Sequence, residues 1–166
     1  GTNSACSGCA AGTYKDLAGS TACSPCIVGT WKDSEGPGKC KSCPAGSSSL
    51  YEGSDKLTNC RCNVGTTGPD GGDLCTECAI GTFKSQPGSS NCEACPANSS
   101  SPAASTFCTC VAGYFGHAGG GCAACATGTY TSIAGLSACL ACDASTYKDL
   151  IGPGACLSCP SHSSSE

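Results

Sequence analysis

The chain has 166 residues, of which 20 are cysteine, and a formal net charge of −4. Leu, Ile, Val and Phe together number 18, too few for an ordinary hydrophobic core, so crosslinks must stabilise the fold. Only 12% of the residues are charged and no basic cluster occurs, which argues against nucleic-acid binding. No apolar run is long enough to cross a bilayer, so we expect no membrane insertion by this segment.

A seventeen-residue phrase occurs five times, and each copy joins a cysteine, a Gly/Ser-Thr-aromatic tripeptide, a glycine and the next cysteine pair. A strict period of this kind predicts an array of small units that pack mainly on their neighbours. We expect one aromatic to form a miniature core over the disulfide of each unit; these are Tyr14, Trp31, Phe83, Tyr130 and Tyr147. The recurrent glycine lies four residues before a cysteine, where we expect a left-handed turn or close backbone approach.

A second unit type begins with Cys-Pro and carries three serines, at Cys43–Ser49, Cys95–Ser101 and Cys159–Ser165. Glycine-rich connectors follow the first two, at 63–74 and 111–121. We therefore divide the chain into superrepeat 1 (1–74), superrepeat 2 (75–121) and an incomplete superrepeat 3 (122–166). No window has a helical period. The predicted fold is a small disulfide-rich, elongated tandem array of short β-ladder and turn units, with little or no helix and a minimal hydrophobic core.

The cysteine content predicts disulfides and therefore a secreted or extracellular surface location. The Cys-x2-Cys spacing also matches a zinc ribbon, but the pattern has no grouping into fours, so we expect no metal and no cofactor. Two pairings remain open. Interlocked receptor-type pairing joins the first cysteine with the third and the second with the fourth. A ladder instead joins Cys9–Cys23, Cys26–Cys40, Cys43–Cys60, Cys62–Cys75, Cys78–Cys92, Cys95–Cys108, Cys110–Cys122, Cys125–Cys139 and Cys142–Cys156.

The ladder leaves Cys6 and Cys159 without partners. When the C-terminus is written into the N-terminus, Cys159 and Cys6 are 13 positions apart, as Cys95 and Cys108 are within the chain. This spacing predicts a disulfide from Cys159 to Cys6 of the next copy, with residues 1–9 of that copy completing superrepeat 3, or one longer chain that continues through both points. Full pairing within the chain is the alternative, because the cysteine count is even.

Glycans are the expected covalent partners. Asn98-Ser99-Ser100 is the only N-glycosylation sequon of the sequence, and it lies in a predicted surface loop. Unused sequons and small polar residues that merely fill tight loops are the alternatives. The O-linked candidates, which lie in the three Cys-Pro units, are Ser47, Ser48, Ser49, Ser99, Ser100, Ser101, Ser163, Ser164 and Ser165.

The phrase C-x2-C-x2-G-T-aromatic-x4-G-x3-C-x2-C-P, ending in C-x-C-x2-G-Y, resembles the ephrin-receptor-like cysteine-rich repeat. Related units occur in tumour-necrosis-factor-receptor-like modules, protist surface antigens and mastigoneme-type proteins. Cys75–Tyr114 is the fullest match. The pattern is broken at Thr67, where the aromatic is missing, and it stops after Cys159. The resemblance implies the repeat fold, and such repeats serve as spacers, receptors and fibre subunits.

Catalysis is not expected, because the two histidines, His117 and His162, have no nucleophile or carboxylate at a recognisable spacing. One hypothesis is a structural segment of a glycosylated, disulfide-stapled extracellular filament or stalk, in which copies join head to tail. The alternative is a ligand-binding or spacer fragment of a receptor or adhesion ectodomain. A ligand site should interrupt the period with an exposed aromatic or charged cluster, whereas the visible interruptions are glycine-rich connectors, which favours the structural hypothesis.

Overall fold

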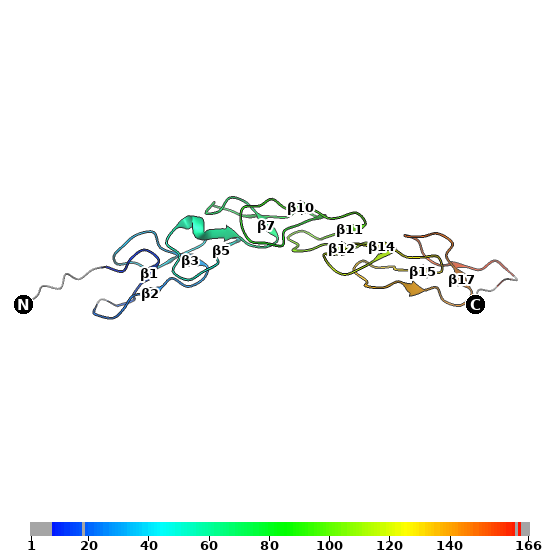
Figure 1. Ribbon diagram of the computed structural model, residues 1–166, viewed down its shortest axis with the longest axis horizontal. Coiled ribbons are helices and arrows are strands. Elements are labelled where there is room, and N and C mark those ends of the chain that lie inside the picture. The colour runs from blue at the N-terminus through cyan, green and yellow to red at the C-terminus, as the bar shows by residue number, and fades with distance from the viewer. Residues whose placement is uncertain (1–7, 18, 162, 164–166) are drawn as a thin grey trace, which may run out of the picture. The chain divides into compact units, whose positions relative to one another are not determined.

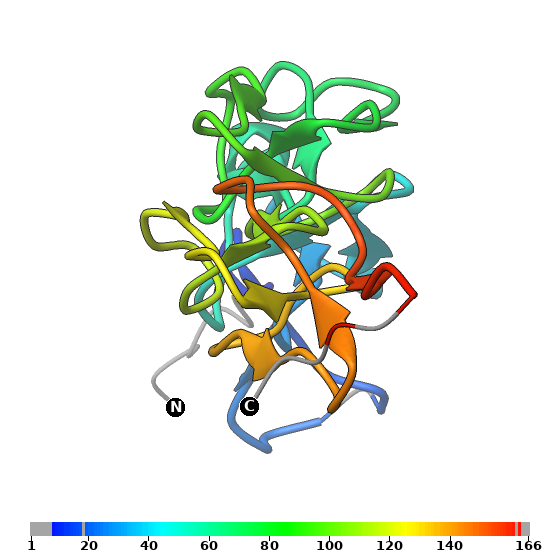
Figure 2. The ribbon, with the colours of Figure 1, turned by 90° about the vertical axis from the view of Figure 1, so that its right-hand side faces the viewer.

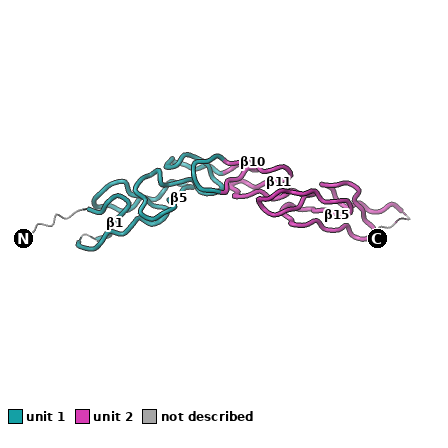
Figure 3. The backbone as a smooth tube through the Cα atoms, viewed as in Figure 1, with its two compact units in different colours: residues 1–77, 86–91 teal, residues 78–85, 92–166 magenta. Residues whose placement is uncertain are grey.

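The structure is a computed structural model that describes residues 8–17, 19–161 and 163. These residues form nine two-stranded antiparallel sheets, each made by strands that follow one another in sequence. Figures 1 and 2 show the short strands and the long loops that join them. The chain divides into two compact units, residues 1–77 with 86–91 and residues 78–85 with 92–166 (Figure 3). The three superrepeats stay a prediction.

We number the sheets as hairpins 1 to 9 in chain order. Unit 1 holds hairpins 1 to 4, whose strands are β1 (Thr13–Tyr14) and β2 (Ser24–Pro25), β3 (Thr30–Trp31) and β4 (Lys41–Ser42), β5 (Ser47–Ser49) and β6 (Cys60–Cys62), and β7 (Thr66–Thr67) and β8 (Thr76–Glu77). Within hairpin 1, Thr13 pairs with Pro25 and Tyr14 with Ser24. A 3-10 helix at Leu57–Asn59 in hairpin 3 is the only helix in the described part of the chain.

Unit 2 holds hairpins 5 to 9, whose strands are β9 (Thr82–Phe83) and β10 (Glu93–Ala94), β11 (Ser99–Ser100) and β12 (Thr109–Cys110), β13 (Tyr114–Phe115) and β14 (Ala123–Ala124), β15 (Thr129–Tyr130) and β16 (Leu140–Ala141), and β17 (Thr146–Tyr147) and β18 (Leu157–Ser158). The predicted fold class, a disulfide-rich tandem array of short ladders with almost no helix, is confirmed.

The Gly-Thr pair of the repeat builds the turn that opens hairpins 1, 2, 4, 5 and 8. In hairpin 1, the N–H and the hydroxyl of Thr13 both donate to the carbonyl of Ala10, at 3.0 and 2.8 Å. The preceding Gly12 has φ +77°, as the third residue of a type II turn requires. The same position is left-handed at Asn98 (φ +63°) and Ser145 (φ +65°), so a side chain is tolerated there when the turn demands it.

Successive hairpins within a unit are joined by main-chain hydrogen bonds that involve the same turn glycine. Between hairpins 1 and 2, the Gly12 carbonyl accepts from Cys26 N at 2.7 Å and Gly12 N donates to the Lys32 carbonyl at 2.8 Å. A loop glycine of hairpin 2 adds a third bond, from Gly36 N to the Cys9 carbonyl at 2.9 Å. In unit 2 the same three bonds join hairpins 8 and 9 through Gly128. The hairpins are therefore coupled mainly through backbone groups.

Cystines form the buried centre of the chain. Cys26, Cys60, Cys62 and Cys125 are fully buried. Among the five aromatics expected to form cores, only Trp31 is buried; Tyr14, Phe83 and Tyr130 are half-buried, and Tyr147 is 37% exposed. The predicted aromatic cores are thus replaced by cystine cores, because a ladder of two residues per strand does not enclose a ring on all sides.

A polar side chain bridges four pairs of neighbouring hairpins. It lies six residues after the first cysteine of a hairpin, and we call this the bridging position. Its side chain donates to the carbonyl of the residue four after the first cysteine of the preceding hairpin: Lys32 to Thr13 (3.0 Å), Ser49 to Thr30 (3.3 Å), Ser101 to Thr82 (2.8 Å) and Thr131 to Tyr114 (3.4 Å). All four side chains are buried, as are Lys84 and Lys148 at the same position.

Buried polar groups of this kind stabilise only when bonded. Lys32 is 2% exposed, and its ammonium also donates to the Gly36 carbonyl at 2.8 Å. The bridging side chains therefore satisfy main-chain carbonyls at these four junctions, where an apolar core would otherwise be needed.

Two of the three glycines at the turn position in unit 2, Gly113 and Gly128, should differ in their tolerance of a side chain. At Gly128 (φ +71°) a Cβ would meet no described atom within 4 Å, so Gly128→Ala should cost about 1–2 kcal/mol from left-handed strain alone. At Gly113 (φ +86°) the Cβ would lie 2.3 Å from Pro153 Cα, which adds an overpacking cost of about 1–3 kcal/mol. Thermal unfolding with hydrogen exchange across residues 110–131 checks the order. Equal losses would contradict this account of the junction.

Replacement of Lys32 tests the bridging position. Lys32→Met keeps the buried stem but removes both hydrogen bonds, so it should lower the free energy of unfolding by about 1–3 kcal/mol. Lys39→Met, at an exposed lysine seven residues later, should change it by less than about 0.5 kcal/mol. Denaturant unfolding followed by the fluorescence of the single tryptophan, Trp31, measures both. A Lys32 variant as stable as the Lys39 variant would show that the two bonds carry no stability.

Candidate functional site

Each hairpin contains one disulfide. The described residues form nine disulfides, which are the nine intrachain pairs of the ladder, with Cα–Cα distances of 5.5 to 5.8 Å. Each joins the start of one hairpin to the residue before its second strand, except in hairpin 3, where Cys60 is the first residue of that strand. Cys159 is half-buried and free among the described residues. Cys6, its predicted partner in the next copy, lies outside the described residues.

Cys159 and Ser163 make the hydrogen bonds with which the complete hairpins begin. Cys159 N donates to the Ser145 carbonyl at 2.9 Å, as Cys142 N does to Gly128 one hairpin earlier. Ser163 donates from both its N–H (3.1 Å) and its hydroxyl (2.7 Å) to the Pro160 carbonyl. These are the turn bonds that open the hairpins at Ser47 and Ser99. We call residues 159–163 the half hairpin.

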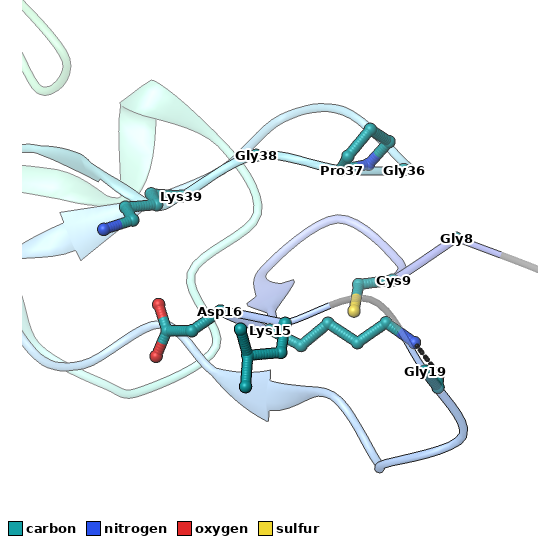
Figure 4. Close-up of a pocket in the computed structure, with 10 residues that line it drawn as sticks. Gly8, Cys9, Lys15, Asp16, Gly19, Gly36, Pro37, Gly38 and Lys39 are labelled. Atoms are coloured by element: carbon teal, nitrogen blue, oxygen red, sulfur yellow. Dashed lines mark hydrogen bonds between the residues drawn. The ribbon is translucent and has the colours of Figure 1, made fainter.

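A cleft of about 680 Å³ lies beside hairpin 1 in unit 1. It is lined by Gly8, Cys9, Lys15, Asp16, Leu17, Gly19, Gly36, Pro37, Gly38 and Lys39 (Figure 4). Lys15 extends along the cleft, and its ammonium donates to the Gly19 carbonyl at 2.8 Å. The walls come from the loops of hairpins 1 and 2.

Lys15 occupies the bridging position of hairpin 1. Whereas Lys32, Lys84 and Lys148 are 2%, 3% and 5% exposed, Lys15 is only half-buried. Lys32 bonds both its own loop glycine and the preceding hairpin, but Lys15 has an acceptor only in its own loop among the residues that the structure describes. The main-chain N–H of Gly19 likewise lacks the described cysteine carbonyl that accepts from Gly36. Among the described residues, Lys15 thus bonds within its own loop, as buried Lys148 does to the Leu150 carbonyl at 2.6 Å.

A second hollow, of about 190 Å³, lies at the loop of hairpin 3. Tyr51 at its edge is 78% exposed, and exposed Glu52, Asp55 and Arg61 also line it. An exposed aromatic beside charged groups is the kind of interruption that a ligand site requires. Sequence reasoning missed this cluster because it lies in the longest disulfide loop and not in a glycine-rich connector.

The glycan candidates differ in access. Asn98 is exposed at the third residue of its turn. Ser47 and Ser99 are half-buried and Ser163 is exposed, and each hydroxyl donates to a proline carbonyl. Ser48 and Ser100 are half-buried. Ser49 and Ser101 are buried at the bridging position, out of reach of a glycosyltransferase in the folded chain. Ser164 and Ser165 lie outside the described residues.

No group of three or more His, Cys, Asp or Glu side chains that could hold a metal ion occurs in the described part of the chain. Among the same residues, no helix has the length and apolar character needed to cross a membrane. His117 is exposed, and His162 lies outside the described residues.

The bridging lysines carried a sequence signal that the repeat analysis did not use. A lysine directly follows the aromatic in four of the five copies, at Lys15, Lys32, Lys84 and Lys148. A single lysine in a loop would be interpreted as a solvated charge. A lysine that recurs at a fixed spacing instead indicates a structural role at the junction between hairpins.

Comparison with known proteins agrees with the geometry. The family model described as "Tyrosine-protein kinase ephrin type A/B receptor-like" matches residues 18–60, 65–110 and 128–166. Ephrin type-B receptor 4 of Homo sapiens is 44% identical over 57 residues, and ephrin type-B receptor 6 of Rattus norvegicus is 40% identical over 57 residues. Each match covers 34% of this chain and 6% of the receptor, so the chain spans a small fraction of the relatives' length.

The family match, together with the nine disulfides, places this segment outside the cell, in the class of cysteine-rich ectodomain repeats. The three matched stretches cover well over half of the sequence. The chain therefore belongs to the ephrin type A/B receptor-like family of cysteine-rich repeats.

Proposed function

We propose that this chain is a non-catalytic structural segment of an extracellular filament or stalk in which copies follow one another head to tail. The half hairpin carries the proposal: Cys159 is free in the described part of the chain, and its turn is already bonded as in the complete hairpins. A partner that supplies a closing cysteine and a second strand would complete a tenth hairpin. Cys6 of another copy, or of a repeat that follows in a longer chain, has the required spacing.

The covalent step is an ordinary thiol oxidation. The Cys159 and Cys6 sulfurs form one S–S bond and release two protons and two electrons, which oxidised glutathione accepts to become two reduced glutathione molecules. A contact of this kind joins two different surfaces, so it propagates unless rotation closes a ring.

A receptor-type role is the second candidate, and the Tyr51 cluster favours it. Tyr51 with Glu52, Asp55 and Arg61 presents an aromatic and both charge signs at one hollow of hairpin 3. In this role the hairpins act as a spacer or bind a protein ligand. Electron microscopy of native material separates the two: filaments support the structural role, and discrete particles support the receptor role.

Non-reducing electrophoresis tests the head-to-tail disulfide. Under glutathione oxidation the chain should give a series of bands at multiples of 16.1 kDa that collapse to one band on reduction. Cys159→Ser should remove the series, because the nine internal disulfides cannot join copies. A stable monomer in which mass spectrometry finds Cys6 joined to Cys159 of the same chain would overturn the proposal.

Glycosylation of the exposed turns is also proposed, and glycopeptide mapping of protein secreted by a glycosylating host tests it. We expect an N-glycan on Asn98, and O-glycans confined to the accessible serines, with none on Ser49 or Ser101. Ser100→Ala removes the sequon but keeps Asn98 in its left-handed turn, so it should abolish the N-glycan without loss of the fold. An unmodified Asn98 in the wild-type protein, or a glycan on Ser49, would contradict this assignment.

A further inference from the structure

We propose that the hollow of hairpin 3 docks a protein segment that presents a lysine or arginine with an acidic residue beside it. The basic side chain would lie against the Tyr51 ring and pair with the carboxylates of Glu52 and Asp55. The acidic neighbour would pair with Arg61. The inference rests on the receptor-type role, the second candidate above, and names the chemistry of its partner; it makes no use of the head-to-tail contact.

Hairpin 2 shows the same kind of contact within the chain. The Lys41 ammonium lies 4.8 Å from the centroid of the Trp31 ring and 3.5 Å from Asp33 Oδ1. A cation is thus held between an aromatic face and a carboxylate, an arrangement that stabilises it twice. At hairpin 3, Tyr51 and Glu52 again place an aromatic beside a carboxylate, but the described residues supply no cation over that ring.

The loop that carries Tyr51 is fixed by hydrogen bonds to hairpin 2. Gly53 N donates to the Cys26 carbonyl at 2.7 Å. The Ser54 carbonyl accepts from Lys32 N at 3.0 Å. Ser54, which is buried, also donates its hydroxyl to the Tyr51 carbonyl at 3.0 Å. The backbone therefore holds Tyr51 at the surface, where it is 78% exposed, and a partner would not have to order this loop on binding.

The rest of the hollow is fixed in the same way. Lys56 N donates to Asn59 Oδ1 at 2.9 Å, and Asn59 N donates to the Lys56 carbonyl at 3.0 Å. These two bonds hold the 3-10 helix of hairpin 3. Arg61 follows on β6 between Cys60 and Cys62, which are fully buried. The charged side chains therefore extend from an ordered backbone on each side of the hollow.

The charged groups that line the hollow have no partner within the described part of the chain. Glu52, Asp55 and Arg61 make no ion pair or side-chain hydrogen bond there. All three side chains are exposed, so water solvates them in the free chain. A partner of matched charge can replace that water without breaking any internal bond, which lowers the cost of binding.

Charge favours a cation as the group that enters the hollow. Two carboxylates and one guanidinium line it, and the exposed Lys56 is not among the lining residues. Asp70 adds a further carboxylate, whose Oδ1 is buried and has no hydrogen-bond partner among the described residues. The adjoining Gly71 packs on the 3-10 helix, where a Cβ would lie 3.0 Å from Thr58 Cα. The surplus of acidic groups attracts a basic side chain, and Arg61 is left for an acidic one.

The size and lining of the hollow favour a protein partner. A volume of about 190 Å³ has room for a single side chain, which suits one anchor residue of a larger interface. Tyr and Arg, which both line the hollow, are the residue types enriched at such anchors. A neutral saccharide could stack on Tyr51, but it would leave three charged side chains without partners.

NMR titration of the full, disulfide-bonded chain with blocked tetrapeptides tests the docking. The probe is acetyl-Gly-Arg-Asp-Gly-amide, and acetyl-Gly-Gln-Asn-Gly-amide is the neutral control of nearly equal size. We expect saturable chemical-shift changes confined to residues 50–61 with the probe and none with the control at the same concentration. Added salt should weaken the binding, because exposed ion pairs are screened.

Matched variants locate the binding. Tyr51→Ser and Glu52→Gln should each weaken binding of the probe by about tenfold or more, because each removes part of the anchor contact. Leu150→Ser changes an exposed residue that, like Tyr51, lies two positions before a loop glycine, and Glu93→Gln removes an exposed carboxylate from β10. Both controls should bind as the wild type does. Unchanged thermal unfolding of all four verifies that the fold is kept.

A charge reversal gives a result that loss of folding cannot imitate. The double variant Glu52→Arg, Asp55→Arg should lose the probe and instead bind acetyl-Gly-Glu-Asn-Gly-amide at the same residues. A double variant that binds neither peptide while it unfolds as the wild type does would contradict the assigned charges.

The remaining outcomes separate this site from the proposed roles of the chain. Equal shifts with the neutral peptide, or binding that Tyr51→Ser leaves unchanged, overturn the docking. Shifts at residues 50–61 with methyl mannoside or methyl galactoside but not with the probe identify a saccharide site and also overturn it. Probe binding confined to another part of the chain overturns this site and leaves the receptor-type role standing. Absence of any binding overturns the site as well, while the electrophoretic test of the filament is unaffected.

Discussion

The left-handed residue three positions after each hairpin's first cysteine is the constraint on which the other contacts depend. It closes the turn that opens the hairpin, and at Gly12 its N–H and carbonyl both bond the next hairpin. An isolated two-stranded hairpin is marginal in water, and strands of two residues are at the lower limit. Disulfides reduce the conformational entropy of the unfolded chain, but the turn residue determines where the next hairpin lies. Each junction between hairpins therefore adds its own contribution to the stability, as in other repeat proteins.

The repeat, the turn glycines and the fold class could be predicted because they leave a period in the sequence. The recurrent lysine could have drawn attention to the bridging position, but its bonds could not be predicted, because the acceptors are main-chain carbonyls nineteen residues away, which have no sequence signature. A lysine in a polar loop is ordinarily solvated, so Lys32 gave no reason to expect burial. The prediction of a core around each aromatic shows the opposite case, a sequence pattern without the expected burial. A recurrent Tyr is typical of a core, but at Tyr147 a two-residue ladder leaves the ring 37% exposed.

Family membership limits the function less than it limits the fold. The same hairpins can space a ligand-binding head from a membrane or continue as a fibre, because neither use changes the junctions. What distinguishes the two uses is where the period breaks. Here it breaks at the Tyr51 cluster within hairpin 3, where the longest disulfide loop exposes an aromatic beside charged side chains. Such a break suits a protein partner.

The backbone character of the junction explains how side chains of different size can serve the same position. Lys32, Ser49 and Thr131 differ in length and charge, yet each donates to the equivalent carbonyl of the preceding hairpin. A main-chain carbonyl acceptor does not vary with sequence, so each hairpin with the correct turn presents the same target to the hairpin that follows it. The register of the array is therefore fixed by the turn and the cysteines, and the side chains of the acceptor face are free to vary.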